Sequence, residues 1–433
     1  PGMTTRASDM TPARTQRGAA TLAITLLLLF AMMVVAGIAN RNLIFEQRAS
    51  ANQARTTKAF EAAEAGLEWA QAMLASDASI GTDCAPEAAP GNVSLRERLL
   101  AYDADSGRFL PRSWSDAGHE VALQAACVRD ESSGTGWACS CPRDGHPALD
   151  LPSATGSHPV FSIRFVAAAR EGMVQLIATG CDRAAANCLP GCVGDAPAVA
   201  VAQVQATLAL LPALAAVPAA ALTAQGEIVA DGAIALSNTD PLASGLTAHA
   251  GGRIALAHAA LQTRPGEPAE LSLAEHDSAL AGIEPQRIPS RLFGVDAARF
   301  RQLPGLHTVA CPADCSALIA DALAAGHRRI RVAGDLNLAG PTIVGAPDRP
   351  VLLVVEGSLR LADGVRIHGA VVQLSPQWDT SGTHDARIDG ALFAAGDVVG
   401  DGTPTIEYDR AVLARLHREV GVFVRVPGSW RDF

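Results

Sequence analysis

The clearest hydrophobic pattern is an uncharged run near the N-terminus, residues 18–40, which lies between Arg17 and Arg41. An α-helix needs about 20 apolar residues to cross the hydrocarbon core of a bilayer. Three arginines and one aspartate precede the run, so the positive-inside rule places the first residues in the cytoplasm and those after Asn40 on the far side. The run is longer than the apolar core of a cleaved signal peptide. We therefore predict a transmembrane helix over 19–39 that stays in the mature protein.

The helical pattern continues beyond the membrane. No proline occurs between Asn40 and Ser76, and Gly66 is the only glycine there. Apolar residues at helical spacing form one stripe, with glutamates beside it on a more polar face. The stripe comprises Phe60, Ala63, Leu67 and Leu74. We predict one helix over 19–76, transmembrane in its first part and amphipathic in its second. The alternative is a membrane anchor followed by a short stalk.

The next part of the chain favours an antiparallel β-sheet. Proline and glycine end the helical pattern after Ser76. Two runs rich in strand-forming residues, at 160–166 and 172–178, are typical of an antiparallel pair, and a third run covers 198–208. We predict a β-rich domain over 77–219 against which the long helix packs.

From residue 220 onward, short strand-like runs alternate with glycine or Asp-Gly turns. Two segments nearly match, Ile367-His-Gly-Ala-Val-Val372 and Ile388-Asp-Gly-Ala-Leu-Phe393, and they begin 21 residues apart. A repeat near 20 residues suits a β-solenoid, in which each coil buries its apolar edge against its neighbours. We predict a solenoid-like, mostly β domain over 220–433, and hence an α+β fold. An irregular β-sandwich with coincidental Asp-Gly turns is the alternative.

Composition excludes several classes of protein. The chain has 433 residues, of which 49% are hydrophobic, so it is long enough to bury sizeable cores and is not a disordered chain. Its 34 basic residues are outnumbered by 44 acidic ones, for a formal net charge of −10. A broadly nucleic-acid-binding protein is usually basic, so this class is disfavoured.

All nine cysteines lie beyond the apolar run, in a compartment where disulfide formation is the default. Cys311 and Cys315 bracket so short a loop that we predict a local bridge. Cys181, Cys188 and Cys192 favour a second bridge after the predicted strand pair. The spacings do not match a paired C-x2-C zinc site, so no metal is predicted. The connectivity stays open, and the odd count leaves one thiol over.

Sequence motifs for catalysis are missing, because the common signatures of hydrolases, metalloproteases and nucleotide-binding enzymes do not occur. Asp103 and Asp105 form only a fragment of a calcium loop, so a turn is predicted there. Aspartates beside glycines, such as Asp335 and Asp397, are also explained by turns. Other candidates are typical of surface or packed positions: His368, His384, His417, Trp378, Trp430 and Phe433. We predict no cofactor and no enzymatic activity.

Both ends of the chain resemble one known family. Residues 16–30, with the sequence QRGAATLAITLLLLF, resemble the N-terminus of type IV pilus minor pilins of the PilX type, as do EQRASANQ at 46–53 and AFEAAEAGL at 59–67. The segments AALTAQG at 220–226 and VRVPGSWRDF at 424–433 resemble the distal part of large PilX-like pilins.

The resemblance implies how the N-terminus is processed. A leader over 1–18 would be removed by the prepilin peptidase after Gly18, leaving Ala19 as the first, methylated residue. Removing the leader's charge of +2 changes the net charge from −10 to −12. Most pilins carry glutamate at the fifth mature position, where this chain has Ala23. That departure argues against a major, repeating subunit.

The resemblance also implies a function and partners. The chain would be a non-catalytic minor pilin that primes assembly of a type IV pilus and caps its tip. Its partners would be other minor pilins and the pilus core, contacted through the N-terminal helix, with a large tip adhesin beyond them. It would sit in the bacterial inner membrane with its C-terminal domain in the periplasm, and later at the pilus tip. The alternatives are a type II secretion minor pseudopilin, a membrane-anchored β-helical polysaccharide hydrolase or lyase, and a cell-wall attachment protein.

Overall fold

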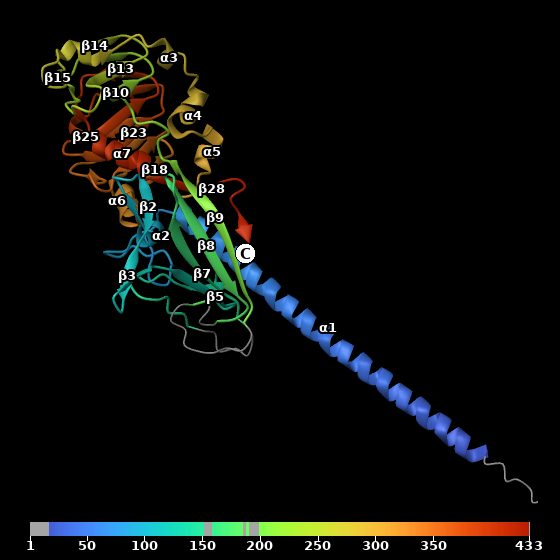
Figure 1. The fold of residues 1–433 in the computed structure, drawn as a ribbon. Coiled ribbons are helices and arrows are strands. Elements are labelled where there is room, and N and C mark those ends of the chain that lie inside the picture. Colours follow the sequence, from blue (N-terminus) through green and yellow to red (C-terminus); the bar gives the residue numbers. More distant parts are fainter. Residues whose placement is uncertain (1–16, 151–157, 185–187, 190–198, 433) are drawn as a thin grey trace, which may run out of the picture. The chain divides into compact units, whose positions relative to one another are not determined.

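The computed structural model describes residues 17–150, 158–184, 188–189 and 199–432. The chain divides into two compact units, residues 1–57 and residues 58–433. Helix α1, Arg17–Ala75, makes up the described part of the first unit and contributes its last turns to the second. Figure 1 shows the two β-rich parts of the second unit, one built around β5 to β9 and the other around β10 to β27.

The last turns of α1 pack into the core of the second unit. Their buried residues recur every three or four positions, so they line one face of the helix. They are Ala59, Ala63, Leu67, Ala70 and Leu74. A Cβ built at Gly66 would lie 2.8 Å from the ring of Phe161, so glycine lets the helix and the sheet approach closely. The predicted long helix with an amphipathic second part is confirmed.

That face of α1 packs against an antiparallel sheet with the strand order β28-β9-β8-β7-β5-β6. The predicted pair is confirmed as β7 (Val160–Ala167) and β8 (Met173–Cys181), with Phe165 opposite Leu176. The third predicted strand is β9 (Val201–Pro212), which pairs with β8. The remaining strands of the path are β5 (Ala125–Arg129), β6 (Trp137–Ser140) and β28 (Gly421–Arg425).

Short elements connect α1 to this sheet. Helix α2 (Leu95–Leu99) begins with a capping box, in which Ser94 accepts from the backbone of Glu97 and Glu97 accepts from that of Ser94. Two hairpins follow before β5. They are formed by β1 (Leu100–Asp103) with β2 (Arg108–Pro111), and by β3 (Ser113–Asp116) with β4 (His119–Ala122).

The C-terminal end of the chain returns to the antiparallel sheet. Strand β28 pairs with β9 so that Gly421 lies opposite Pro212, and β29 (Arg431–Asp432) pairs farther along β9. The boundary predicted from sequence placed these residues in the distal domain. The solenoid is therefore inserted between β9 and β28, which are neighbours in one sheet.

The inserted part is a stack of parallel strands, as the predicted solenoid requires. Its main ladder runs through β17, β18, β21, β23, β25, β10, β13 and β16, and every pair along it is parallel. The bounds of these strands are β10 Ala220–Ala224, β13 Leu246–Ala250, β16 Leu273–Ala274, β17 His307–Val309, β18 Arg329–Val332, β21 Val351–Val355, β23 Arg366–Gln373 and β25 His384–Ala394.

Two further faces complete each coil. One face consists of the strands β14-β11-β26-β24 and the separate pair β19-β22. The other face extends the sheet of the main ladder from β25 through β27 and β12 to β15, and β20 pairs with β23 in the same sheet. Their bounds are β11 Ile228–Ala230, β12 Ala235–Ser237, β14 Ile254–Leu256, β15 Ala260–Gln262, β19 Leu336–Leu338, β20 Ile343–Val344, β22 Leu359–Leu361, β24 Gln377–Asp379, β26 Asp397–Gly400 and β27 Thr403–Tyr408.

The near-repeat found in the sequence stacks directly in the structure. Ile367 lies opposite Ile388, and Gly369 lies opposite Gly390. Both isoleucines are fully buried inside the coil. Gly390 has φ +146°, and a Cβ there would collide with the carbonyl oxygen of Gly369, so the tight stacking requires glycine. The 21-residue repeat is therefore one coil of the solenoid.

Coil order along the stack differs from chain order. Strand β10, the first of the solenoid in sequence, pairs with β25 on one side and with β13 on the other. The short helix η1 (Ala269–Ser272) precedes β16. After β16 the chain passes through α3 (Ser278–Ala281), η2 (Pro285–Arg287), α4 (Ile288–Phe293) and α5 (Ala297–Arg301). It then resumes at β17, at the opposite end of the main ladder, and builds back to β25.

Two helices cover parts of the solenoid. Helix α6 (Ser316–Ala324) follows β17 and buries Ile319 and Ala322. Helix α7 (Arg410–Arg418) packs on β23 and β25 and buries Leu413 and Leu416. All five residues of β21 are apolar and buried, so this strand is covered on both of its faces.

Candidate functional site

The first unit presents an apolar helix surface on every side. Its large apolar side chains between Leu22 and Phe45 are 43% to 68% exposed. By length and composition α1 can cross a membrane. A helix that is hydrophobic all round is stable only in lipid or packed among other helices. This surface is therefore a site of insertion or assembly.

The predicted processing site lies at the start of this helix. Gly18 and Ala19 are in the first turn of α1. Ala23, one turn farther along, is exposed. The leader residues 1–16 lie outside the described part of the chain.

A buried carboxylate joins the end of α1 to the solenoid. The Asp77 side chain is 1% exposed, and its two oxygens bind Arg329 of β18 at 2.9 Å and Arg96 of α2 at 3.3 Å. Arg329 also donates to the carbonyl of Ala75 at 3.2 Å, and Arg96 donates to that of Gly421 at 3.1 Å. Buried charges require such pairing. The cluster of Asp77, Arg96 and Arg329 thus ties α1, α2, β18 and β28 together.

A second layer of charge surrounds this cluster. Glu97 lies 3.6 Å from Arg328 and 3.4 Å from Arg349, both in the solenoid. Burial lowers the pKa of Arg328 and raises the pKa of Glu419, the residue after α7. Arg98 donates to the carbonyls of Ile80, Gly81 and Cys141, and burial lowers its pKa.

The C-terminal segment contacts the polar face of α1. The indole of Trp430 donates to Glu64 at 2.7 Å, and its ring meets Phe60 edge-on with centroids 6.4 Å apart. Arg425 lies 3.0 Å from Glu68. Two of the glutamates that the sequence places beside the apolar stripe therefore bind the end of the chain, and Trp430 lies at the surface, 38% exposed. Phe433 is outside the described residues.

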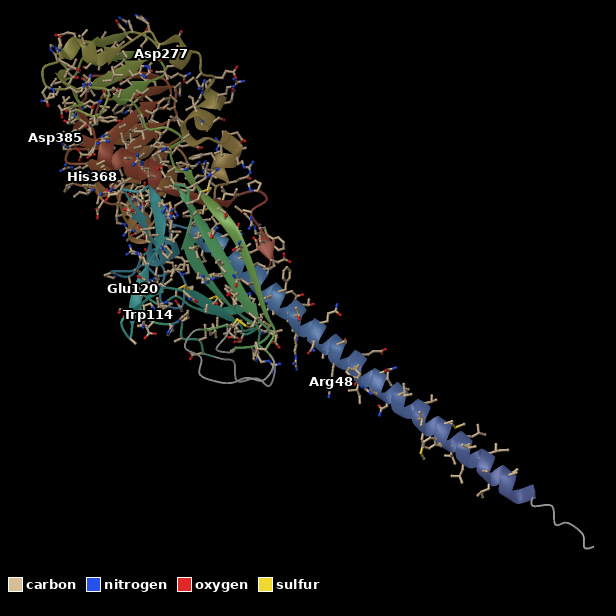
Figure 2. All side chains as sticks on the ribbon, in the orientation of Figure 1. Arg48, Trp114, Glu120, Asp277, His368 and Asp385 are labelled. Atoms are coloured by element: carbon tan, nitrogen blue, oxygen red, sulfur yellow. A yellow bond between two sulfur atoms is a disulfide. The ribbon has the colours of Figure 1, made fainter. Side chains whose placement is uncertain are left out.

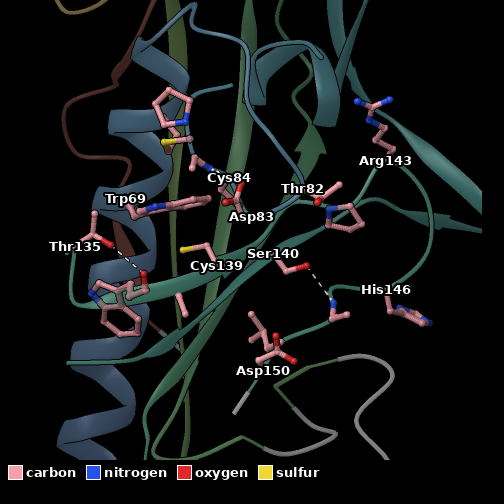
Figure 3. Close-up of a pocket in the computed structure, with 18 of the residues that line it drawn as sticks. Trp69, Thr82, Asp83, Cys84, Thr135, Cys139, Ser140, Arg143, His146 and Asp150 are labelled. Carbon is pink, nitrogen blue, oxygen red and sulfur yellow. Dashed lines mark hydrogen bonds between the residues drawn. The ribbon is translucent and has the colours of Figure 1, made fainter. Parts of the chain in front are cut away.

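A groove of about 950 Å³ lies beside β6, shown in Figure 3. Trp69 and Met73 of α1 form one wall, and Ser140 accepts from the backbone of Ala148 at 3.1 Å on another. The ring of Trp137 is already used, because Phe161 lies 4.8 Å from it and the guanidinium of Arg129 lies 5.6 Å from it. We assign it no ligand.

A ladder of charged side chains follows the outer face of the solenoid. His368, Asp389 and Glu407 occupy the same position in three successive coils. Asp389 is bound by Arg366 at 2.7 Å and by Arg387 at 2.6 Å, and Arg387 also pairs with Glu407. His368, labelled in Figure 2, places Nδ1 3.2 Å from Asp389 but makes no hydrogen bond through it among the described residues. Burial lowers the pKa of His368 despite this carboxylate.

The aspartates beside glycines hold the backbone of the solenoid. Asp335 accepts from the amide of Ser358 at 2.7 Å, which lowers the pKa of Asp335. Asp397 accepts from the amide of Glu227 at 2.8 Å. Asp103 accepts from Ser106 and from the amide of Asp105, which lowers its pKa and forms a turn at the fragment of a calcium loop. Their carboxylates stabilise turns and adjacent coils.

Other candidates from the sequence fall in three settings. Trp378 is fully buried in the solenoid and donates to the carbonyl of Leu359 at 3.2 Å. His417 contacts the carbonyl oxygen of Leu214 through Nδ1 at 2.8 Å. His384 is exposed at the start of β25. The described residues contain no group of three or more His, Cys, Asp or Glu placed to hold a metal ion.

The structure pairs eight cysteines. Cys311 bonds to Cys315, and Cys181 bonds to Cys188. Cys192 is outside the described residues. The other two bridges, Cys84–Cys141 and Cys127–Cys139, lie in the antiparallel sheet and its adjoining loop. The sequence predicts no partners for these four cysteines, because the paired cysteines are 57 and 12 residues apart and no local pattern links them.

The buried charge cluster was also missed from sequence. The sequence predicts that the helical pattern ends after Ser76, and it does not single out Asp77, Arg96 or Arg329. The sequence offers one indication of this cluster: a charged residue directly follows a helix that is expected to bury one face.

Comparisons with known proteins agree with the N-terminal pattern. Residues 17–68 match the family model described as PilX N-terminal. No curated protein matches the chain. Among solved structures, the competence-associated pilin ComZ from Thermus thermophilus aligns over 88% of this chain and 98% of its own, at 11% identity and a TM-score of 0.20, a similarity too low to support any inference. Residues 17–68 are therefore similar to the N-terminal segment of the PilX family.

Proposed function

We propose that the protein is a minor pilin, a non-catalytic structural subunit that helps prime assembly of a type IV pilus and caps its tip. The observation that carries this proposal is the first unit, a helix whose apolar side chains are exposed on all sides and whose residues match the PilX N-terminal family. Such a surface is stable in the inner membrane before assembly and among other pilin helices afterwards.

Two features support a place at the tip. Residues 58–433 form one compact unit, which is too bulky to repeat at every position of a thin filament. Ala23 provides no carboxylate for the N-terminal amine of a neighbouring subunit, and an unpaired buried amine would be costly at each repeat. A subunit present once, at the end of the filament, avoids both penalties.

The proposed partners follow from the same features. The prepilin peptidase would cleave after Gly18, and other minor pilins and the pilus core would pack on the apolar part of α1. The solenoid, carried on the outer side of the sheet, would be the part that faces a large tip adhesin. The protein would be anchored with its second unit in the periplasm until it is extracted into the pilus.

The mature N-terminus tests the assignment as a pilin. Protein isolated from membranes is expected to begin at N-methylated Ala19, as read by mass spectrometry of the N-terminal peptide. A chain trimmed beyond Asn40 and free in the periplasm would refute it. Gly18→Ala should block the cleavage, whereas Gly37→Ala, a matched glycine change inside the helix, should leave it intact.

The position in the filament needs a separate experiment. Gold labelling of the second unit on isolated pili is expected to mark one end of each filament. Dense decoration along the shaft would refute a tip position while leaving the assignment as a pilin intact.

One alternative has a specific observation in its favour. The ladder of His368, Asp389 and Glu407 lies on the outer face of a parallel solenoid, where a membrane-anchored polysaccharide hydrolase or lyase would carry its acidic residues. Two arginines already bind Asp389, which favours a structural role. Turnover of uronate polysaccharides that is abolished by Asp389→Asn would establish the enzyme instead. A type II secretion pseudopilin remains the nearest alternative among assembly proteins.

A further inference from the structure

The solenoid has an incomplete coil at the β16 end of its main ladder. A complete coil has three strands, as in β10, β11 and β12 or in β13, β14 and β15. The next coil contains only β16, which pairs with β13, and the chain then leaves through α3. Among the residues that the structure describes, no strand pairs with the outer edges of β14 and β15. Figure 1 shows these two strands at one end of the solenoid.

Burial of the apolar side chains decreases at this incomplete coil. Ile254 of β14 stacks on Ile228, and Leu261 of β15 stacks on Leu236. Ile228 and Leu236 are fully buried, whereas Ile254 and Leu261 are only half-buried, as is Leu256. A solenoid coil buries its apolar residues against the coils on both sides of it. The missing strands therefore leave an apolar surface open to solvent.

The backbone of both strands also points toward the missing coil. The amide of Ala260 donates to the preceding coil at 2.9 Å, so the amide and carbonyl of the next residue, Leu261, point the other way. The amide of Ala257 donates to the preceding coil at 3.1 Å, so Leu256 presents its backbone groups in the same manner. A strand edge of this kind accepts an extended chain by strand addition.

The opposite end of the stack is closed by the chain itself. There β19 is the terminal strand of its face, yet Leu336 and Leu338 are fully buried. The segment at the start of α6 lies on this edge, because the amide of Cys315 donates to the carbonyl of Asn337 at 2.9 Å. Ile319 of α6 is fully buried in the same core. The chain thus caps one end of the solenoid and leaves β14 and β15 uncapped at the other.

Charge around the incomplete coil disfavours a second copy as the partner. Between residues 253 and 287 there are three arginines and five acidic residues, so the segment has a net charge of three minus five, or −2. Glu270 and Glu275, on either side of β16, are exposed. Two copies that met end to end would bring these carboxylates together, whereas lysine or arginine beside a partner strand would pair with them. The arginines are in ion pairs within the chain: Arg253 with Glu227, Arg264 with Glu267, and Arg287 with Glu284.

We propose that the outer edges of β14 and β15 bind an extended segment of a different protein, which completes the coil that β16 begins. The segment would place apolar side chains over Ile254, Leu256 and Leu261 and basic side chains beside Glu270 and Glu275. A helix uses its amides and carbonyls internally, so it could not pair with these edges. The inference rests on the proposed function and adds the surface and the chemistry by which the solenoid holds a partner.

The test places a photo-crosslinking phenylalanine analogue at His258, an exposed residue between β14 and β15, in cells that assemble pili. It compares the native chain with two double variants that each add a charge of +2. Leu256→Lys with Leu261→Lys alters the proposed edge. Leu318→Lys with Ile343→Lys is the matched control, because these apolar residues are 40% and 67% exposed in α6 and β20, at the capped end.

The expected adduct joins His258 to a peptide of a different protein, in which apolar residues alternate along the chain and lysine or arginine lies nearby. Its yield should fall about tenfold or more with lysines at 256 and 261, because each places a charge at the centre of the bound surface. The yield should change little in the control. Near-ultraviolet circular dichroism and recovery in sheared pili show whether each variant folds and assembles.

A second variant covers the case in which the two lysines unfold the last coil. The Leu261 amide points away from β12, so Leu261→Pro removes no hydrogen bond between these strands, and strand edges tolerate proline at such positions. The adduct yield should fall about fivefold or more, because one backbone hydrogen bond to the partner is lost.

Three results would overturn the inference: equal yields in the native chain and the edge variants, adducts mainly with a second copy of the chain, or adducts mainly with lipid or carbohydrate. The absence of any adduct in the native chain would overturn it as well. If the native chain is missing from sheared pili, the proposed function fails and the inference fails with it. If the native chain is present but the edge variants have no effect, only the inference fails.

Discussion

Asp77 and Arg329 form a buried ion pair 2.9 Å long, although 252 residues separate them in the chain. Asp77 directly follows the helix that carries the apolar N-terminal surface, and Arg329 begins a central strand of the solenoid. The pair is shielded from solvent and shared with Arg96, so it connects the end of α1 to the solenoid within the second unit.

Asp77→Asn should destabilise the second unit strongly. It would leave Arg96 and Arg329 buried without their carboxylate, which typically costs about 3–5 kcal/mol. Thermal unfolding of the full chain in detergent, followed by near-ultraviolet circular dichroism, measures the loss. Asp105→Asn, at an exposed turn, is the matched control and should change stability by no more than about 0.5 kcal/mol. Equal midpoints for the two variants would contradict a structural role for the pair.

Trp430 should hold the C-terminal segment on α1. Trp430→Ala removes both the edge-on contact with Phe60 and the hydrogen bond to Glu64, so amide exchange in β28 and β29 should become faster. Trp430→Phe keeps a ring and loses only the hydrogen bond, which is worth about 0.5–3 kcal/mol, and should show an intermediate rate. Unchanged exchange in the alanine variant would mean that β-pairing with β9 alone holds the segment.

The four disulfides should contribute unequally. Cys84–Cys141 spans 57 residues and Cys311–Cys315 spans four. In the chain-entropy model these loops correspond to about 4 and about 2 kcal/mol of stabilisation. Replacing each pair with alanine should therefore lower the denaturant midpoint more for Cys84 and Cys141. The reverse order would show that local packing, and not loop closure, governs their effect.

Two histidines should make stability depend on pH. Burial lowers the pKa of His327 and of His368 below the usual value of 6.5. His327 faces His307, Arg329 and Asp77, and His368 faces Arg366, Arg387, Asp389 and Asp409. Between the lowered folded-state pKa and 6.5 the unfolded chain binds more protons. The free energy of unfolding should therefore decrease as pH falls through that window.

Denaturant titrations at several pH values measure this slope. His327→Gln combined with His368→Gln should flatten it. His276→Gln, at a side chain that is 70% exposed, is the control and should leave the slope unchanged. A slope that survives in the double variant would assign the pH dependence to other groups.

Local patterns were enough to predict much of the fold. Three predicted features depend only on residues within a few helical turns or one hairpin. They are the uncharged run, the apolar stripe at Ala63, Leu67 and Leu74, and the β7–β8 pair. The near-repeats beginning at Ile367 and Ile388 revealed the solenoid because stacked coils present similar side chains at the same position. These signals arise from periodicity, which a single sequence displays directly.

The rest depends on pairings between distant segments. No local feature of residues 421–432 indicates β9 as their partner, and no spacing indicates that β10 pairs with β25. The Asp77 cluster was hidden for the same reason, since each of its members resembles an ordinary surface charge. The predicted processing site and the predicted turn aspartates were named from sequence.

The position of Gly421 opposite Pro212 has a consequence for how such a chain can change over time. The chain between these two residues leaves the sheet and returns to it at one point, so the solenoid is an insertion between the paired strands β9 and β28. If a tight turn replaced this insertion, β9 and β28 would form a hairpin with the same register. Arg329 of β18, near one end of the main ladder, binds Asp77 after α1, whereas β16 ends the other side of the ladder, so relatives could add coils beyond β16 without disturbing α1.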